Sequence, residues 1–219
     1  MEYLEKMLLD EWKTAKTKAL QGENVDGVTV LTDFERGKIE SGRFTVEHYK
    51  SRILKRLEKG YAWKEIEKYK RVMALPAKTV NCVTIGVDWS KNIYGMQAAA
   101  TITIIYSDGR QEYLQGDRTG GCGYDKRSSA VAYALRESDY MYKLLYEYVN
   151  KQMILPAEKR RFSCGMGIFG YNVDKLDYLP FFEYGVGINS TLHTIELITG
   201  LSHETEHETK NSDFYIITK

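Results

Sequence analysis

Apolar residues in the first third of the chain recur at the three- and four-residue spacing of amphipathic helices. Leu4, Leu8 and Trp12 mark the first such stripe, because residues at this spacing share one face of a helix. Thr45 is a favoured N-cap residue and Gly60 is a favoured helix-terminating residue, so both indicate boundaries. This pattern predicts helical segments, with their caps, at residues 2–20, 32–42, 45–60 and 61–75.

After Pro76 the pattern changes to the alternation of apolar and polar residues that is typical of β-strands. The turn signal Ser107-Asp108-Gly109 separates two of these runs and predicts a hairpin. We expect strands at residues 80–88, 96–106, 110–114 and 213–217, and helices at residues 126–151 and 189–200. The sequence therefore predicts an α+β fold, in which a basic helical N-terminal region, residues 1–76, precedes an antiparallel sheet packed by helices, residues 77–219.

Composition places the chain among ordinary globular proteins. Its 43% hydrophobic and 12% aromatic residues argue against intrinsic disorder. No apolar run approaches the roughly 18 residues of a membrane span, and the first residues lack the plan of a signal peptide, so we expect no membrane association. The three cysteines are far apart and odd in number, which favours reduced thiols and a cytoplasmic location.

The net charge of +1 conceals an uneven distribution of charged residues. Residues 1–35 carry −4, residues 36–78 carry +8 and residues 79–219 carry −3. The +8 segment favours an acidic partner, either a nucleic acid or an acidic protein or nucleoprotein surface. The alternative is a solvated helical face with its charge screened by salt. The candidate contact residues in this segment are Arg52, Lys55, Arg56, Lys59, Lys64, Lys68 and Arg71.

A glycine-rich run from Thr119 to Asp125 leads into the helix expected from Lys126. Backbone N–H groups at a helix start are unpaired, and the positive end of the helix dipole attracts anions. Neither the G-x-x-x-x-G-K-[ST] pattern nor the G-x-G-x-x-G pattern is present, so the run predicts neither of these nucleotide-binding loops. The candidate anion contacts are Gly120, Gly121, Gly123, Lys126 and Arg127.

The order of helix, three strands, glycine-spaced loop and helix over residues 61–150 resembles the double-stranded-RNA-binding domain. In that family such a loop leads into a basic helix start and an alanine-rich face, as it does here from Gly121 to Leu135. The resemblance implies that Lys126 and Arg127 contact phosphates across a groove. Ala130 departs from the pattern, because the family usually has another lysine there.

The run Thr119-Gly120-Gly121-Cys122-Gly123-Tyr124-Asp125-Lys126 is also similar to a run in uncharacterised proteins of phages and mobile elements. That similarity implies a phage-encoded inhibitor of a host defence system such as CRISPR–Cas, for example an anti-CRISPR protein.

The run His203-Glu204-Thr205-Glu206-His207 matches the H-E-x-x-H pattern of zinc hydrolases. On a helix, His203 and His207 would lie one turn apart and share a zinc ion, with Glu204 as the general base. The run follows Gly200 in a very polar stretch, outside the apolar helix that precedes it. Adventitious or structural metal binding, or a solvated loop, are therefore the alternatives to a catalytic site.

Taken together, these patterns favour a non-enzymatic binding protein for a nucleic acid or nucleoprotein, with no resident cofactor. Two alternatives stay open. One is a metal-dependent hydrolase that uses His203, Glu204 and His207 with zinc. The other is a protein–protein interaction domain without a nucleic-acid role.

Overall fold

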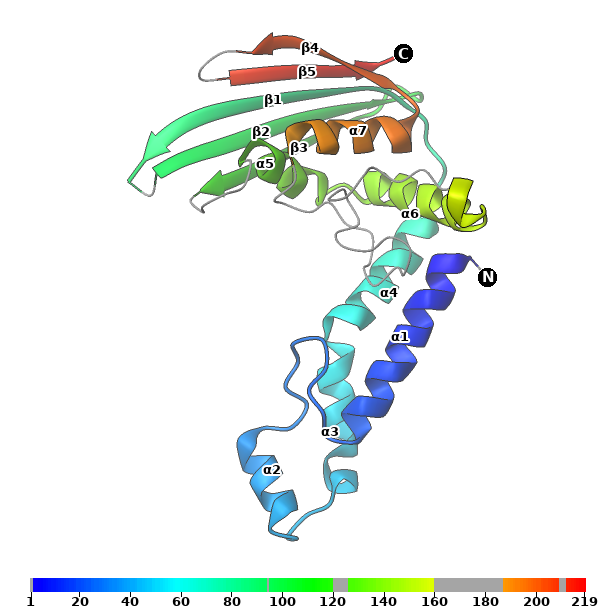
Figure 1. The fold of residues 1–219 in the computed structure, drawn as a ribbon, viewed down its shortest axis with the longest axis vertical. Coiled ribbons are helices and arrows are strands. Elements are labelled where there is room, and N and C mark those ends of the chain that lie inside the picture. The colour runs from blue at the N-terminus through cyan, green and yellow to red at the C-terminus, as the bar shows by residue number, and fades with distance from the viewer. Residues whose placement is uncertain (1, 94, 120–125, 160–186, 209–211) are drawn as a thin grey trace. The chain divides into compact units, whose positions relative to one another are not determined.

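The computed structural model describes residues 2–93, 95–119, 126–159, 187–208 and 212–219. The chain forms two compact units, Met1–Ala74 and Leu75–Lys219. The first unit is helical, and the second is built on an antiparallel β-sheet (Figure 1). The predicted α+β class is therefore confirmed. No helix in the described part of the chain is long and apolar enough to cross a lipid bilayer.

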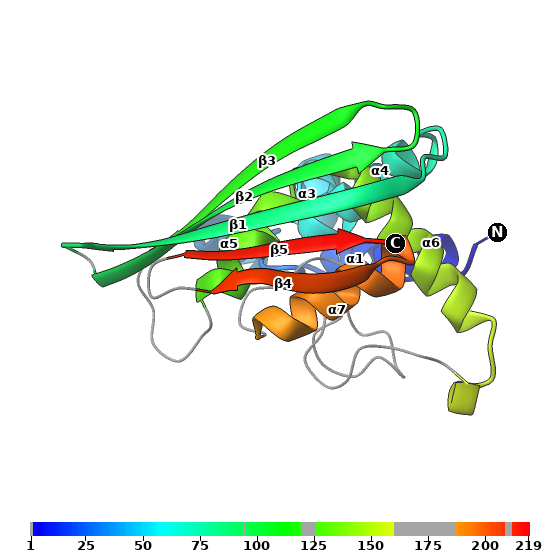
Figure 2. The same ribbon diagram turned by 90° about the horizontal axis from the view of Figure 1, so that it is seen from above.

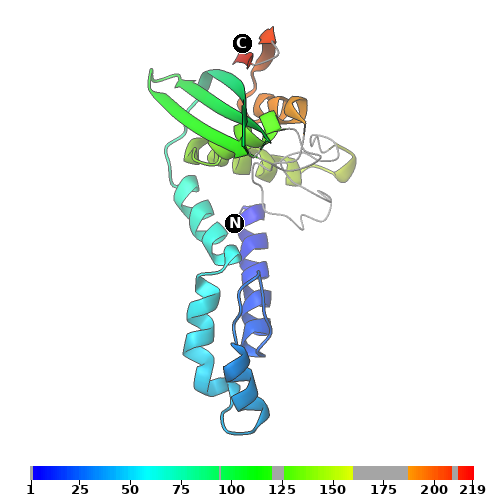
Figure 3. The same cartoon turned by 90° about the vertical axis from the view of Figure 1, so that its left-hand side faces the viewer.

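Helices make up the regular structure of the first unit. They are α1 (Tyr3–Leu20), α2 (Asp33–Glu40), α3 (Val46–Glu58) and α4 (Tyr61–Met73), close to the predicted segments. Both α3 and α4 pack against α1, and they follow one another end to end along it (Figure 3). This arrangement differs from a helix-turn-helix motif, in which the two helices cross at about 90–120°.

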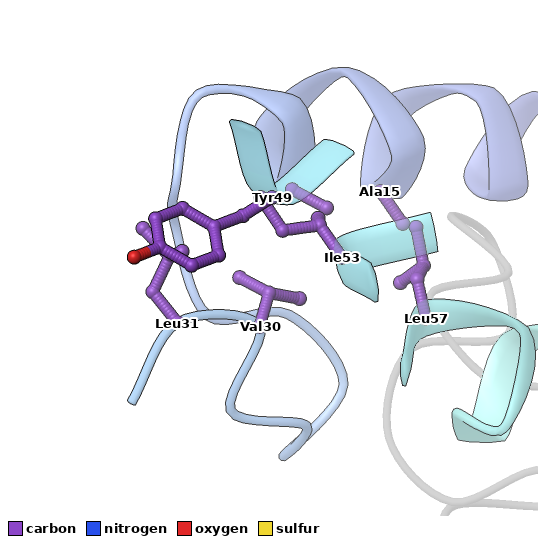
Figure 4. Close-up of a cluster of buried hydrophobic side chains, with 7 residues drawn as sticks. Ala15, Val30, Leu31, Tyr49, Ile53 and Leu57 are labelled. Atoms are coloured by element: carbon purple, nitrogen blue, oxygen red, sulfur yellow. The ribbon is translucent and has the colours of Figure 1, made fainter. Parts of the chain in front are cut away.

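One cluster of buried apolar side chains in the first unit lies between α1, α3 and the loop that precedes α2. Val30 and Leu31, in that loop, are buried, so this link is not a strand but part of the core. Burial of each large apolar side chain adds about 1.5–3 kcal/mol to the free energy of unfolding. The buried cluster, most of which is labelled in Figure 4, consists of Ala15, Ala19, Val30, Leu31, Tyr49, Ile53 and Leu57.

The second unit contains a sheet of five described strands in the order β3-β2-β1-β5-β4 (Figure 2). Neighbouring strands are antiparallel, and the hairpin at Ser107–Gly109 forms as predicted, with Gly109 at a φ of +81°. The strand β4 was not expected from the hydrophobic pattern. The strands are β1 (Val80–Asn92), β2 (Gly95–Tyr106), β3 (Gln111–Thr119), β4 (Ser202–Glu208) and β5 (Ser212–Thr218).

Helices of the second unit cover one face of this sheet (Figure 1). They are α5 (Lys126–Leu135), α6 (Asp139–Met153) and α7 (Ile188–Thr199), and a short 3₁₀ helix follows α6 at Ala157–Lys159. The helix α5 packs on β2 and β3, and α7 contacts α5, α6 and β4. Alternate residues of β2, such as Ala98, Ile102 and Tyr106, are buried, as expected for a sheet covered on one face.

Two helix boundaries in the second unit differ from those predicted from the sequence. The single helix expected over residues 126–151 is wrong, because α5 ends at Leu135 and α6 begins after Ser138. The hydroxyl of Ser138 caps α6 by accepting a hydrogen bond from the backbone N–H of Met141 at 3.2 Å. The helix α7 begins at Ile188 and has Gly187 as its N-cap, whereas the prediction placed the cap at Asn189 or Ser190, two or three residues later.

Candidate nucleic-acid interface

Basic residues follow one side of α3 and α4 in a row that we call the basic stripe. In α3 the row runs at three- and four-residue steps beside the buried residues Tyr49, Ile53 and Leu57. Viewed along the helix axis, the basic row lies roughly 120° around from the buried face in α3. In α4 the basic row lies at a similar angle from the buried face, in the same direction of rotation. The basic stripe consists of Arg52, Lys55, Arg56, Lys59, Lys64, Lys68 and Arg71.

Three lysines form the middle of the basic stripe, and their side chains are exposed. They are Lys55 in α3, Lys59 directly after it and Lys64 in the first turn of α4. From Arg52 to Arg71 the stripe extends over about 28 Å at the helical rise of 1.5 Å per residue. That length corresponds to roughly eight base pairs of a duplex at 3.4 Å per pair. Helix geometry therefore puts the exposed lysines Lys55, Lys59 and Lys64 on one side of α3 and α4.

Two arginines of the basic stripe are held by a buried carboxylate, that of Glu35 in α2. The guanidinium of Arg56 donates to Glu35 Oε2 at 2.7 Å and to Oε1 at 3.2 Å, and it also donates to the backbone oxygen of Val30 at 2.6 Å. Arg52 forms a second ion pair with Glu35 at 3.1 Å. Arg56 is therefore largely committed to the fold, whereas the side chain of Arg52 stays 60% exposed.

The environment of Glu35 keeps it ionised. Hydrogen bonding from Arg56 lowers the pKa of Glu35 from 4.5 to about 2, and hydrogen bonds from Thr32 act in the same direction, whereas burial opposes them. The side chain of Thr32 also accepts from the backbone N–H of Glu35, which completes a capping box at the start of α2. The predicted helix start at residue 32 is confirmed, but neither the capping box with Glu35 nor the partnership with α3 was predicted.

The two predicted contacts at the start of α5 are both engaged within the second unit. Lys126 donates from Nζ to the backbone oxygen of Met96 in β2 at 2.9 Å. Arg127 forms an ion pair at 3.1 Å with Asp213 of β5, which is only 4% exposed. The Arg127 guanidinium also lies 5.8 Å from the ring centroid of Trp89. Arg127 therefore neutralises a buried carboxylate, a role that the sequence did not reveal.

The remaining parts of the predicted anion loop lie beyond what the structure describes. Gly120, Gly121 and Gly123 belong to residues 120–125, which are outside the described ranges. In the resemblance to the double-stranded-RNA-binding domain, α4 belongs to the first unit, whereas β1, β2, β3 and α5 belong to the second. Both the loop site and the resemblance stay predictions.

The H-E-x-x-H run lies on a strand and not on a helix. His203 and His207 both belong to β4, where residues four apart are separated by about 13 Å. The helical arrangement that would bring the two imidazoles to one zinc ion is therefore absent here, and the expected polar loop is wrong as well. The side chain of His207 is outside the described part of the structure, so metal binding by this pair stays a prediction.

His203 instead joins α7 to β4 through Glu196. Its Nδ1 lies 2.8 Å from Glu196 Oε1, and its backbone N–H donates to the same oxygen at 2.8 Å. His193 lies 3.3 Å from the other carboxylate oxygen. Burial raises the pKa of Glu196, but the hydrogen bonds from His203 and His193 together lower it below the ordinary value. Among the described side chains, no group of three or more histidine, cysteine, aspartate or glutamate residues is arranged to hold a metal ion.

Comparison of the chain with protein-family models, with curated proteins and with solved structures finds no match.

Proposed function

We propose that this protein binds nucleic acid without catalysing a reaction, and that the basic stripe of α3 and α4 is the contact surface. One observation carries the proposal. After Glu35 has paired with Arg52 and Arg56, the lysines Lys55, Lys59 and Lys64 remain exposed in a row on the same side of the unit. Ammonium groups that follow one another along one side of a protein can contact successive phosphates of a strand.

The chemistry of the row favours contact with the phosphate backbone. A lysine ammonium is a compact point charge on a flexible stem, whereas base recognition is more often performed by the planar arginine fork. The proposed binding is therefore only weakly dependent on sequence. A nucleoprotein presents the same phosphates, and inhibition of a CRISPR–Cas complex is a narrower form of the proposal, which rests on the resemblance of residues 119–126.

The proposal is tested by reversing the three exposed lysines together. The variant Lys55→Glu/Lys59→Glu/Lys64→Glu is compared with the intact chain by fluorescence anisotropy of labelled duplex RNA, duplex DNA and single strands. We expect the affinity for the bound nucleic acid to fall at least about thirtyfold, since each lost phosphate contact and each added negative charge weakens binding.

A matched control shows whether the loss of binding depends on where the lysines lie or only on the change in net charge. The variant Lys13→Glu/Lys16→Glu/Lys18→Glu makes the same charge change at exposed positions of α1 in the same unit. We expect this control to weaken binding much less than the stripe variant. Equal losses in the two variants, or no binding by the intact chain, would contradict the proposal. Salt-insensitive capture of a protein would then favour the interaction-domain alternative.

A further inference from the structure

One aromatic side chain near the basic stripe is strongly exposed. Phe34, in the first turn of α2, is 71% exposed, which is the largest value for an aromatic residue in the described part of the chain. The ammonium of Lys38, one turn later, lies 4.4 Å from the centroid of the Phe34 ring and 4.9 Å from that of Phe44. Phe34 therefore has a cation beside it and most of its surface in solvent.

A glycine keeps the surface next to Phe34 open. Gly37 lies in the interior of α2, where glycine is less favourable than alanine. A Cβ atom at this position would meet nothing within 4 Å, so packing within the described structure does not require glycine there. Residues three apart are neighbours on a helix surface. Gly37 is exposed and has no side chain, so nothing projects from this position beside Phe34.

The helix that carries Phe34 is joined to the basic stripe through Glu35. Glu35, the residue after Phe34, forms the ion pair with Arg52 at 3.1 Å and thereby fixes α2 against α3. Arg36, in the middle of α2, and Arg43, three residues after its end, are also exposed. An exposed ring with an open flank, beside cations and at the end of a lysine row, is the combination by which proteins bind single strands. The ring stacks on a base, and the cations contact the phosphates.

We propose that Phe34 and the open surface at Gly37 form a stacking site for an unpaired nucleobase, with Lys38 placed for the adjacent phosphate. This inference rests on the proposed function and specifies its ligand as nucleic acid with a single-stranded segment. An apolar side chain of a protein partner is the competing occupant. The cations around the ring favour the base. They are attracted to the phosphates of a nucleic acid, whereas an apolar protein surface would remove their hydration without replacing it.

Two substitutions test the site in the full-length chain. Phe34→Leu keeps an apolar side chain but removes the aromatic face, and Phe34→Trp enlarges that face. Stacking contributes about 1–3 kcal/mol per base, so we expect Phe34→Leu to weaken single-strand binding about tenfold and Phe34→Trp to preserve it. Binding of a blunt duplex should change less than twofold in both variants.

A third substitution distinguishes the loss of the stacking site from a loss of folding. Gly37→Leu replaces a poor helix former by a good one and fills the open surface beside Phe34. We expect a higher Tm together with single-strand binding that is at least about fivefold weaker, a combination that unfolding cannot produce. As a control, Tyr113→Leu removes an aromatic ring that is 62% exposed in the second unit, and it should leave binding unchanged.

The outcomes distinguish this inference from the proposed function. If Phe34→Leu and Gly37→Leu bind single strands as well as the unmodified chain, while the stripe variant has lost binding, the stacking site is refuted and the stripe stands. If the stripe variant also retains full affinity, both fail. Equal weakening of single-strand and blunt-duplex binding by Phe34→Leu would likewise overturn the stacking role.

Discussion

Glu35 links separate segments of the first unit through one carboxylate. It caps α2 with Thr32, holds Arg56 of α3 and pairs with Arg52 on the same helix. Because the side chain is only 3% exposed, an unpaired charge there would be costly, and the two guanidinium groups supply the compensation. The same contacts determine which arginines of the basic stripe remain available to a ligand.

The low pKa of Glu35 predicts a specific acid dependence of stability. A carboxyl group whose folded-state pKa is lowered stabilises the fold above its unfolded pKa, and this stabilisation is lost as the pH falls through the folded value. For Glu35 the window runs from about 4.5 down to about 2. We expect Glu35→Gln to lower the free energy of unfolding by about 2 kcal/mol at pH 7. That difference should shrink steadily below pH 4.5 in urea unfolding at a series of pH values. A difference that stays constant down to pH 2 would contradict the ionised pair.

Arg127 is expected to act on stability before it acts on any ligand. Its removal in Arg127→Ala leaves the buried carboxylate of Asp213 without its cation, so we expect a loss of about 2–4 kcal/mol in urea unfolding. Lys126→Ala removes only a hydrogen bond to a backbone oxygen and should cost under about 1 kcal/mol. Similar values for the two variants would show that Asp213 does not depend on Arg127. Binding tests at this helix start are therefore better made with Lys126→Glu.

At the scale of elements, the contact of α5 with β3 depends on one glycine. A Cβ atom on Gly116 would lie 2.2 Å from the backbone oxygen of Ala130 and 2.5 Å from the backbone nitrogen of Ala134. Because both of these atoms belong to the backbone of α5, neither can move away without shifting the helix. The alanines on this face of α5 and the glycine of β3 together allow the close approach.

Gly116→Ala is therefore expected to destabilise the second unit by about 1–3 kcal/mol or more, the usual cost of overpacking. Gly86→Ala is a matched control in β1 of the same sheet, because its Cβ would meet only the Phe214 ring at an ordinary 3.8 Å. We expect the control to cost under about 1 kcal/mol. Thermal unfolding of the two variants checks the prediction, which fails if Gly116→Ala is as stable as Gly86→Ala.

Much of the secondary structure was predictable because local signals and the hydrophobic period agreed. Helices α1 to α4 and the hairpin at Gly109 follow from caps, glycines and spacing that the sequence displays. The break between α5 and α6 was missed because the apolar period continues across it, although Ser138 is an ordinary cap residue. The strand β4 was missed because it carries polar and charged residues, and it forms by pairing with β5.

The candidate site was predictable only in part. The row of basic residues from Arg52 to Arg71 is visible in the sequence, as is its helical spacing. The pairing of Arg52 and Arg56 with Glu35 is not, because it joins residues 17 and 21 positions apart through tertiary packing. The same holds for Arg127 and Asp213, which are 86 positions apart. The exposure of Phe34 also depends on how α2 packs, which its own sequence does not determine.

At the scale of the whole molecule, the two units differ in the sign of their charge. Residues 1–74 carry a net charge of +3, and residues 75–219 carry −2. Within the first unit the positive charge is concentrated after residue 35, where residues 36–74 carry +7. A polyanion is therefore expected to bind the first unit, and the second unit is expected to contribute little long-range attraction.

The salt dependence of nucleic-acid affinity tests the central claim most directly. We would measure the association constant by fluorescence anisotropy between about 50 and 200 mM salt, for the intact chain and for Lys55→Glu/Lys59→Glu/Lys64→Glu. We expect a steep linear fall of log K with log salt in the intact chain, and a slope that is smaller by about 2–3 in the variant. Binding that is absent, that does not weaken with salt, or that keeps the same slope in the variant would contradict it.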